Sequence, residues 1–115
     1  MWQIKIIREP ISRDELRQLA QEGFGDFIKA VVDLEQKIMA IGSELHADEE
    51  EVLLEQGSRQ ADLWGINIYP DKRDEERIEF DSMINLRPSQ GNRSRGVQDA
   101  MTRQKIQELV VTLIK

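Results

Sequence analysis

Residues 28–34 alternate between apolar and polar side chains, and this pattern constrains the fold of the chain more than any other. The stretch 27–45 also fits one apolar face of a helix, because apolar residues recur there at helical spacing. Two features favour strands instead: the two-residue period of the first half, and the polar step Glu35–Lys37 before a second apolar run at 38–45. We therefore predict a β-hairpin, although no Asn-Gly or Asp-Gly pair specifies its turn.

Three further segments have the composition of strands. Residues 2–7 are rich in β-branched side chains, and Trp2 shares a face there with two isoleucines. Residues 63–69 alternate in the same way. Residues 78–86 also alternate, so we expect a fifth strand with one apolar and one polar face.

Three segments carry the start and stop signals of helices. A capping box at Ser12–Glu15 begins the first helix, and Gly23 ends it. Asp48 is expected to cap a second helix, which ends at Gly57. A third helix follows Asp99 and has a strong apolar stripe. The stripe consists of Ile106, Leu109, Val110, Leu113 and Ile114.

These segments predict an α+β fold: an antiparallel sheet of about five strands built from hairpins, with about three helices packed mainly on one face. We expect the other face to be partly open to water. A chain of 115 residues suits a single domain covering 1–115. It contains no cysteine, which excludes disulfides and thiolate metal sites and suits a reducing compartment. With no signal peptide or membrane-spanning run, we expect a cytoplasmic protein that is not bound to a membrane.

Charge is distributed unevenly along the chain. The formal net charge is -6, which argues against nonspecific binding to nucleic acid. Residues 44–56 contain acidic side chains and no Lys or Arg, whereas residues 82–98 contain Arg87, Arg93 and Arg95 and no carboxylate. One interpretation is that two solvated faces attract each other across the fold or across a homodimer. The other is that the basic segment binds a ligand.

The polar face of the fifth predicted strand is the first candidate site. It presents Asp81, Asn85 and Arg87, and the neighbouring strand can add Asn67. Arginine offers a planar fork of donors that suits carboxylate or phosphate groups. The full set of candidate ligand-binding residues is Arg87, Arg93, Arg95, Asn67, Asn85, Asn92 and Asp81. The simpler interpretation is a solvated sheet face with an ion pair between Asp81 and Arg87.

The only histidine, His46, is the second candidate. Glu44, His46 and Asp48 would project from one side of a strand and resemble part of a metal site, but a single histidine makes that weak, and we expect no bound metal or other cofactor. His46 is also the one candidate for a catalytic base, with Ser82 among the candidate nucleophiles. The simpler interpretation is a hydrogen-bonded structural histidine.

Four runs carry a resemblance that covers nearly the whole chain. They are Lys-Ala-Val-Val-Asp-Leu at 29–34, Gly-Ser-Glu-Leu-His-Ala-Asp at 42–48, Asp-Leu-Trp-Gly-Ile-Asn-Ile-Tyr-Pro at 62–70 and Ile-Glu-Phe-Asp-Ser-Met-Ile-Asn-Leu-Arg-Pro-Ser-Gln-Gly-Asn-Arg-Ser at 78–94. Together they resemble a family of short prokaryotic proteins classed as a domain of unknown function. The resemblance implies no activity, cofactor or binding residue.

The function must therefore be inferred from the residues. The leading hypothesis is a small module that binds a protein partner or a small anionic ligand through the polar sheet face and the arginine-rich loop, as a homodimer. The first alternative is a small hydrolase in which His46 is the general base and Arg87 or Arg93 stabilises charge. The second is a structural or regulatory dimeric subunit. Whether the protein is an enzyme is left open by the sequence.

Overall fold

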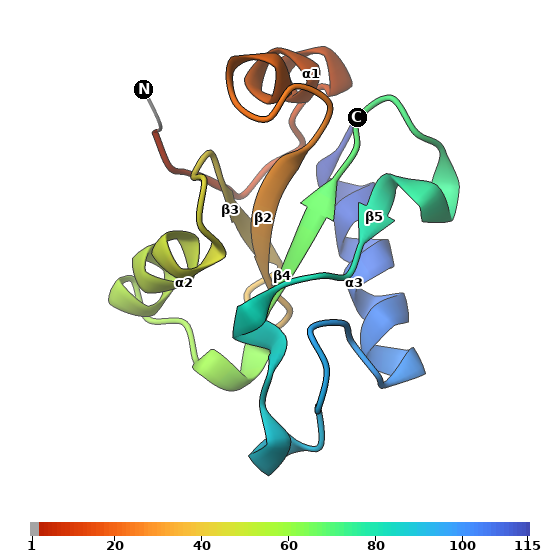
Figure 1. The fold of residues 1–115 in the computed structure, drawn as a ribbon. Helices are drawn as coiled ribbons and strands as arrows, with labels where there is room; N and C mark the ends of the chain where they lie inside the picture. The colour runs from red at the N-terminus through yellow and green to blue at the C-terminus, as the bar shows by residue number, and fades with distance from the viewer. Residues whose placement is uncertain (1–2) are drawn as a thin grey trace.

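The computed structural model describes residues 3–115, with the side chains of residues 74 and 75 left aside. Five strands form one antiparallel sheet in the order β1-β3-β2-β4-β5 (Figure 1). The strands are β1 (Lys5–Ile7), β2 (Ile28–Asp33), β3 (Ile38–Ile41), β4 (Leu63–Ile68) and β5 (Ile78–Glu79), and the α-helices are α1 (Arg13–Glu22), α2 (His46–Glu55) and α3 (Ala100–Leu113). The predicted α+β class with an antiparallel sheet is confirmed. None of the helices in residues 3–115 is both long and apolar enough to span a membrane.

The β2–β3 hairpin confirms the strand prediction for the segment that also fitted a helix. Asp33 fixes its turn: one carboxylate oxygen accepts hydrogen bonds from the backbone N–H groups of Glu35 (2.9 Å) and Gln36 (3.0 Å). Lys37 then takes a left-handed conformation (φ 59°) and leads the chain into β3. The prediction that the second strand runs to residue 45 is wrong, because β3 ends at Ile41.

Helices cover both faces of the sheet. On one face α1 and α3 form the larger core, in which Leu16, Ile106 and Val110 cluster with side chains of β2, β3 and β4. Helix α2 lies on the opposite face (Figure 1), where its Leu53 clusters with Val31 and neighbouring strand residues. Two of the three described helices thus share a face, while the other face is covered by α2 and by the segment that follows β5, with a cleft between them.

Two of the three N-cap residues predicted for the helices are confirmed. Ser12 accepts a hydrogen bond from the Glu15 N–H at the start of α1, and Asp99 accepts one from the Thr102 N–H at the start of α3. The prediction that Asp48 caps the second helix is wrong, because α2 begins two residues earlier and its N-cap residue, Leu45, has no capping side chain. The first strand is confirmed over Lys5–Ile7, and Trp2 lies outside the described residues.

The prediction of a strand over 78–86 is wrong beyond Glu79. The chain leaves the sheet there and forms a 3-10 turn at Met83–Asn85, which Ser82 caps. In place of a continued strand, the side chain of Asn85 pairs with β4: its amide oxygen accepts from the Gly65 N–H (2.8 Å) and its amide nitrogen donates to the Gly65 carbonyl (2.9 Å). The expected alternating polar face along 79–87 therefore does not form.

Candidate functional site

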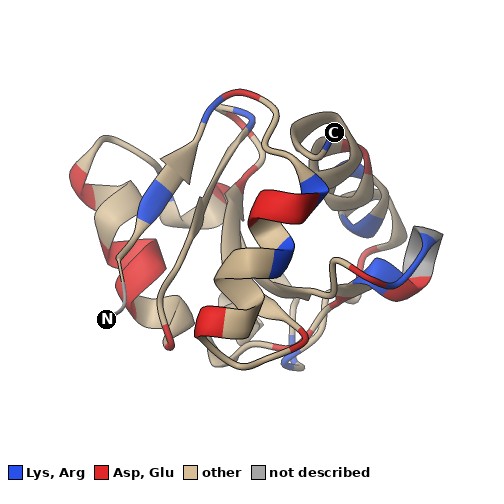
Figure 2. Cartoon of the chain, turned by 90° about the horizontal axis from the view of Figure 1, so that it is seen from above, with Lys and Arg blue, Asp and Glu red and all other residues tan. Residues whose placement is uncertain are grey.

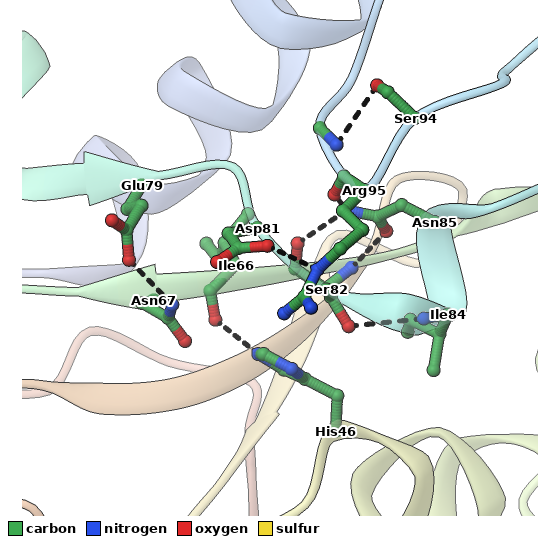
Figure 3. Close-up of polar contacts among 12 residues, drawn as sticks. His46, Ile66, Asn67, Glu79, Asp81, Ser82, Ile84, Asn85, Ser94 and Arg95 are labelled. Carbon is green, nitrogen blue, oxygen red and sulfur yellow. Dashed lines mark hydrogen bonds and ion pairs between the residues drawn. The ribbon is translucent and has the colours of Figure 1, made fainter.

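A cleft of about 400 Å³ opens between the start of α2 and the segment that follows β5 (Figure 3). The strand register brings three polar residues together in a row at this end of the sheet, since Lys29 of β2 lies opposite Asn67 of β4, which lies opposite Glu79 of β5. All three line the cleft, as do His46, Asp81 and Arg95. We refer to these six residues with their surroundings as the α2 cleft.

Asn67 contributes an unpaired acceptor to the α2 cleft. Its amide nitrogen donates to a carboxylate oxygen of Glu79 (2.8 Å), and the Tyr69 hydroxyl donates to the same oxygen (3.3 Å). Because a carboxylate only accepts, this contact fixes the amide with its oxygen turned away from Glu79 (Figure 3). That Oδ1 atom is buried and has no donor among the described residues. The Asn67 residue is 6% exposed, so an unmet acceptor there is costly.

His46 is held as a neutral ring at the edge of the same cleft. Its Nε2 lies 2.7 Å from the backbone carbonyl of Ile66, which only accepts, so Nε2 carries the hydrogen and donates it (Figure 3). Burial lowers the pKa of His46, and the nearby cations Lys29 and Arg95 lower it further, against opposing effects of the Ile66 hydrogen bond and Asp81. Nδ1, which accepts no hydrogen bond from the described residues, is left as an acceptor on a ring that lines the cleft.

The first turn of α2 adds backbone donors. Leu45 caps the helix without a side-chain hydrogen bond, and its own N–H donates to the Ser43 hydroxyl (3.2 Å). The N–H groups of His46 and Ala47 have no acceptor among the described residues, as is usual for the first residues of a helix without a capping side chain. Both residues line the cleft, where the positive end of the helix dipole favours a negative group.

Arg95 reaches the cleft from the loop and pairs with Asp81. Its Nε lies 2.7 Å from a carboxylate oxygen of Asp81, and both side chains are about half exposed (55% and 45%). The backbone carbonyl of Arg95 accepts from the Ser82 N–H and from the Asn85 amide, which holds the loop against the sheet edge. The predicted ion pair between Asp81 and Arg87 is therefore wrong, since Arg95 takes this place.

Arg87 is buried at another part of the sheet edge. Its guanidinium donates to the backbone carbonyls of Leu63, Gln60 and Ile84, and it lies 4.5 Å from the centroid of the Trp64 ring. Burial lowers the pKa of Arg87. It does not line the α2 cleft. These contacts give Arg87 a structural role at the edge of the sheet.

The side-chain amides of Asn85 and Asn92 are also engaged in hydrogen bonds within the fold. The Asn92 amide nitrogen donates to the backbone carbonyls of Asn85, Ser94 and Gly96, and its oxygen accepts from the Gln98 N–H. Both asparagines are buried, at 4% exposure for Asn92 and 0% for Asn85. Of the seven candidate ligand-binding residues, the structure brings Asn67, Asp81 and Arg95 together in the α2 cleft; Arg93 is exposed and lies outside its lining.

The predicted alignment of Glu44, His46 and Asp48 is absent. It required a strand, whereas His46 and Asp48 lie in the first turn of α2 and Glu44 precedes the helix. Among residues 3–115, leaving aside the side chains of residues 74 and 75, no three histidine, cysteine or carboxylate side chains gather as a metal would need. The hydrolase hypothesis placed Arg87 or Arg93 beside His46, and neither lines the cleft that His46 lines.

The acidic and basic segments interact electrostatically across the fold, through Glu50 and Arg87. The ribbon of α2 carries acidic residues and no basic ones (Figure 2). Within the described part of the chain, the observed ion pairs link Arg17 to Asp14 and Asp71, and Arg95 to Asp81, so none joins α2 to the loop. Glu49 and one carboxylate oxygen of Glu50 are buried, and the charge of Glu50 interacts with that of Arg87, so the two segments attract each other at this point without a direct ion pair.

Two residues that line the cleft and one that packs behind it were not singled out from the sequence. Lys29 and Glu79 flank Asn67 only because of the strand register, which the sequence does not specify. Gly65 is the third: a Cβ atom there would lie 2.6 Å from the Ser82 Cβ, so the loop packs directly on the backbone of β4. A glycine inside a strand pattern is the signal for such a close approach.

Two comparisons gave no match, one with curated proteins and one with solved structures. A third, with family models, matched residues 5–113 to a family described as "Protein of unknown function (DUF5674)". The match covers nearly the whole chain and confirms the resemblance to a family without an assigned function.

Proposed function

Since the chain belongs to this family of unknown function, DUF5674, we propose its function from the geometry of the α2 cleft: it binds a small polar molecule that carries an anionic group. The unpaired Oδ1 of Asn67 carries the proposal. A buried acceptor without a donor costs on the order of 1–3 kcal/mol, so a site that keeps one gains from a ligand that supplies the donor. Glu79 and Tyr69 hold this amide in place, which makes the acceptor part of a preorganised site.

The anionic group has donors on the other side of the cleft. The backbone N–H groups of His46 and Ala47 are available at the start of α2, and the terminal guanidinium nitrogens of Arg95 have no acceptor among the described residues. A carboxylate or phosphate suits both kinds of donor. Leu45 and Met83, at 52% and 63% exposure, add apolar surface at the rim, as is common for small-molecule sites.

The experiment is a titration of the labelled protein with phosphate, acetate, nucleotides and small carboxylic acids, followed by NMR shifts and calorimetry. We expect Arg95→Gln to weaken binding about tenfold, because it removes a charge-assisted contact of the order of 1.4 kcal/mol. Arg93→Gln is the matched control, since Arg93 lies on the same loop outside the cleft. The proposal is wrong if no anion shifts the Asn67 and His46 signals, or if both substitutions weaken binding equally.

Hydrolysis and association with another chain are tested separately. Hydrolysis by His46 would require a substrate to bring its own charge stabilisation to the cleft or to use Arg95, and it would show as turnover lost on substitution of His46. Association with a second copy or with a protein partner stays a prediction, measured by sedimentation of the purified chain. Neither is needed for ligand binding in the cleft.

A further inference from the structure

The charges that line the α2 cleft cancel. Lys29 and Arg95 are cationic, Glu79 and Asp81 are anionic, and the His46 ring is neutral. A site for a multiply charged anion, such as a polyphosphate, normally gathers cations in excess of carboxylates. A cleft with balanced charges is instead complementary to a ligand that carries both signs.

Two acceptors in the cleft lack donors. Asn67 Oδ1 is fixed by the contact of its own amide nitrogen with Glu79. In the neutral His46 ring, Nε2 carries the hydrogen and donates it to the Ile66 carbonyl, so Nδ1 has no hydrogen and can only accept a hydrogen bond. The carboxylates of Glu79 and Asp81 lie in the same lining. A group with several hydrogens and a positive charge satisfies this set better than a single hydroxyl does.

The donors of the cleft are the backbone N–H groups at the start of α2 and the guanidinium of Arg95. We infer that the ligand of the α2 cleft is a zwitterion in which an ammonium group and a carboxylate lie close together, as in an α-amino acid. The ammonium is met by Asn67 and His46, where the carboxylates of Glu79 and Asp81 offset the cations Lys29 and Arg95, and the carboxylate is met by the first turn of α2 and Arg95. This inference rests on the proposed function and narrows its ligand class.

Matched compounds test the ammonium requirement. L-alanine, lactate and propionate share a three-carbon carboxylate and differ by an ammonium, a hydroxyl or neither; L-aspartate, malate and succinate repeat the series with a second carboxylate. We expect the amino acid of at least one series to bind about tenfold more tightly than both analogues, the size of one charge-assisted hydrogen bond. Calorimetry and NMR shifts at the Asn67 side chain are the measurements.

Two substitutions assign the preference to Asn67. Asn67→Leu removes the acceptor and should abolish the difference in affinity between the amino acid and its deamino analogue, whatever its effect on the affinity for the analogue itself. Because Asn67 is buried, Glu79→Gln serves as a second variant at an exposed position; it frees the Asn67 amide to turn over and should reduce the same preference. Glu55→Gln, at the far end of α2, is the matched control for the lost charge.

The outcomes separate the inference from the proposed function. Equal binding of the three members of each series overturns the zwitterion and leaves the anion site standing. A preference that survives both Asn67→Leu and Glu79→Gln also overturns it. If none of the six compounds binds, the zwitterion is overturned, and binding of phosphate or nucleotides that Arg95→Gln weakens would show that the cleft still takes an anion.

Discussion

The side chain of Asn85 makes both backbone hydrogen bonds of Gly65, and so continues the sheet beyond the point where β5 ends. The same amide nitrogen also donates to the Arg95 carbonyl (2.9 Å). One side chain therefore joins β4 to the loop that brings Arg95 to the cleft. The stability of the loop and the geometry of the cleft are coupled through this residue.

Replacement of Asn85 should destabilise the protein strongly. Asn85→Ala leaves the N–H and carbonyl of Gly65 buried without partners, and we expect a loss of about 2–4 kcal/mol in the free energy of unfolding. Asn85→Asp keeps the shape but turns a carboxylate oxygen toward two carbonyls, so it should be no more stable than the alanine variant. Urea denaturation measures both. An aspartate variant as stable as the wild type would contradict this assignment of the contacts.

Gly65 and Ser82 should show energetic coupling. A methyl group at position 65 would lie 2.5 Å from the Ser82 hydroxyl and 2.6 Å from its Cβ, so Gly65→Ala must push the loop from the strand at a cost of about 1–3 kcal/mol. The double variant Gly65→Ala with Ser82→Gly removes the atoms that collide and should recover part of that loss. A double-mutant cycle measured by chemical denaturation gives the coupling. Purely additive effects would mean that the clash does not set the cost.

The part of the fold that follows β5 shows why the sequence pattern misled. Alternation from Ile78 to Leu86 fits a strand with one apolar face, yet Phe80 packs on the core beneath α1 and α3 while Ile84 packs on the core beneath α2. The chain crosses the sheet edge between them. An alternating pattern indicates that every second residue is buried, but it does not indicate which side of the sheet those residues pack against. A strand and a segment that crosses the sheet edge therefore give the same pattern.

Local signals, by contrast, were sufficient where the contacts are local. Ser12 and Asp99 cap helices through bonds to residues three positions away. The predicted apolar stripe is buried over Ile106, Leu109, Val110 and Leu113 of α3, whereas Ile114 lies just beyond the helix and bridges Ile11. The site required long-range information. Asn67 was identified because it faces the polar side of its strand, but its partners Lys29 and Glu79 depend on register, and the burial of Arg87 depends on carbonyls of a distant strand.

Substitution by lysine should destabilise the protein at Arg87 but not at Arg93. Arg87→Lys replaces the planar guanidinium, which donates to three backbone carbonyls, with a single ammonium group. We expect the free energy of unfolding to fall by about 2–3 kcal/mol. Arg93→Lys, on the exposed loop, should change it by less than about 0.5 kcal/mol. Thermal and urea unfolding compare the two. Equal stability of both variants would return Arg87 to the list of ligand-binding candidates.

Glu49 should make the stability of the protein fall as the pH rises. It is fully buried, with one carboxylate oxygen accepting from the Ser43 N–H (3.0 Å) and the other without a partner among the described residues. Burial raises its pKa well above the usual value, chiefly through desolvation. The folded state thus binds the proton more tightly than the unfolded state, so the stabilisation is full below the unfolded pKa and is lost as the pH rises through the folded pKa.

Glu49→Gln tests this linkage. The amide is neutral at every pH, so the variant should show a flatter dependence of unfolding free energy on pH and be more stable than the wild type at alkaline pH. Each unit of pKa shift corresponds to about 1.4 kcal/mol. Glu55→Gln, on the exposed end of the same helix, is the control. Parallel pH profiles for wild type and Glu49→Gln would show that Glu49 does not titrate differently in the two states.

His46 should make ligand binding in the α2 cleft depend on pH. The ring is neutral because its folded pKa is lowered by burial, with Lys29 and Arg95 opposing protonation and Asp81 favouring it. The stability due to the neutral ring is present above the unfolded pKa and is lost as the pH falls through the folded pKa. Below that pH, Nδ1 gains a hydrogen and becomes a donor, so it can no longer accept from an ammonium group.

We therefore expect the affinity for an amino acid to fall in acid at a pH below the ordinary range of histidine, while the affinity for its deamino analogue is unchanged or rises. Titration of the His46 ring signals by NMR, with and without ligand, measures the pKa shift directly. The bound amino acid should lower that pKa further, because it binds the neutral ring. A ligand that raises the His46 pKa would show that His46 meets the anionic end of the ligand and not its ammonium group.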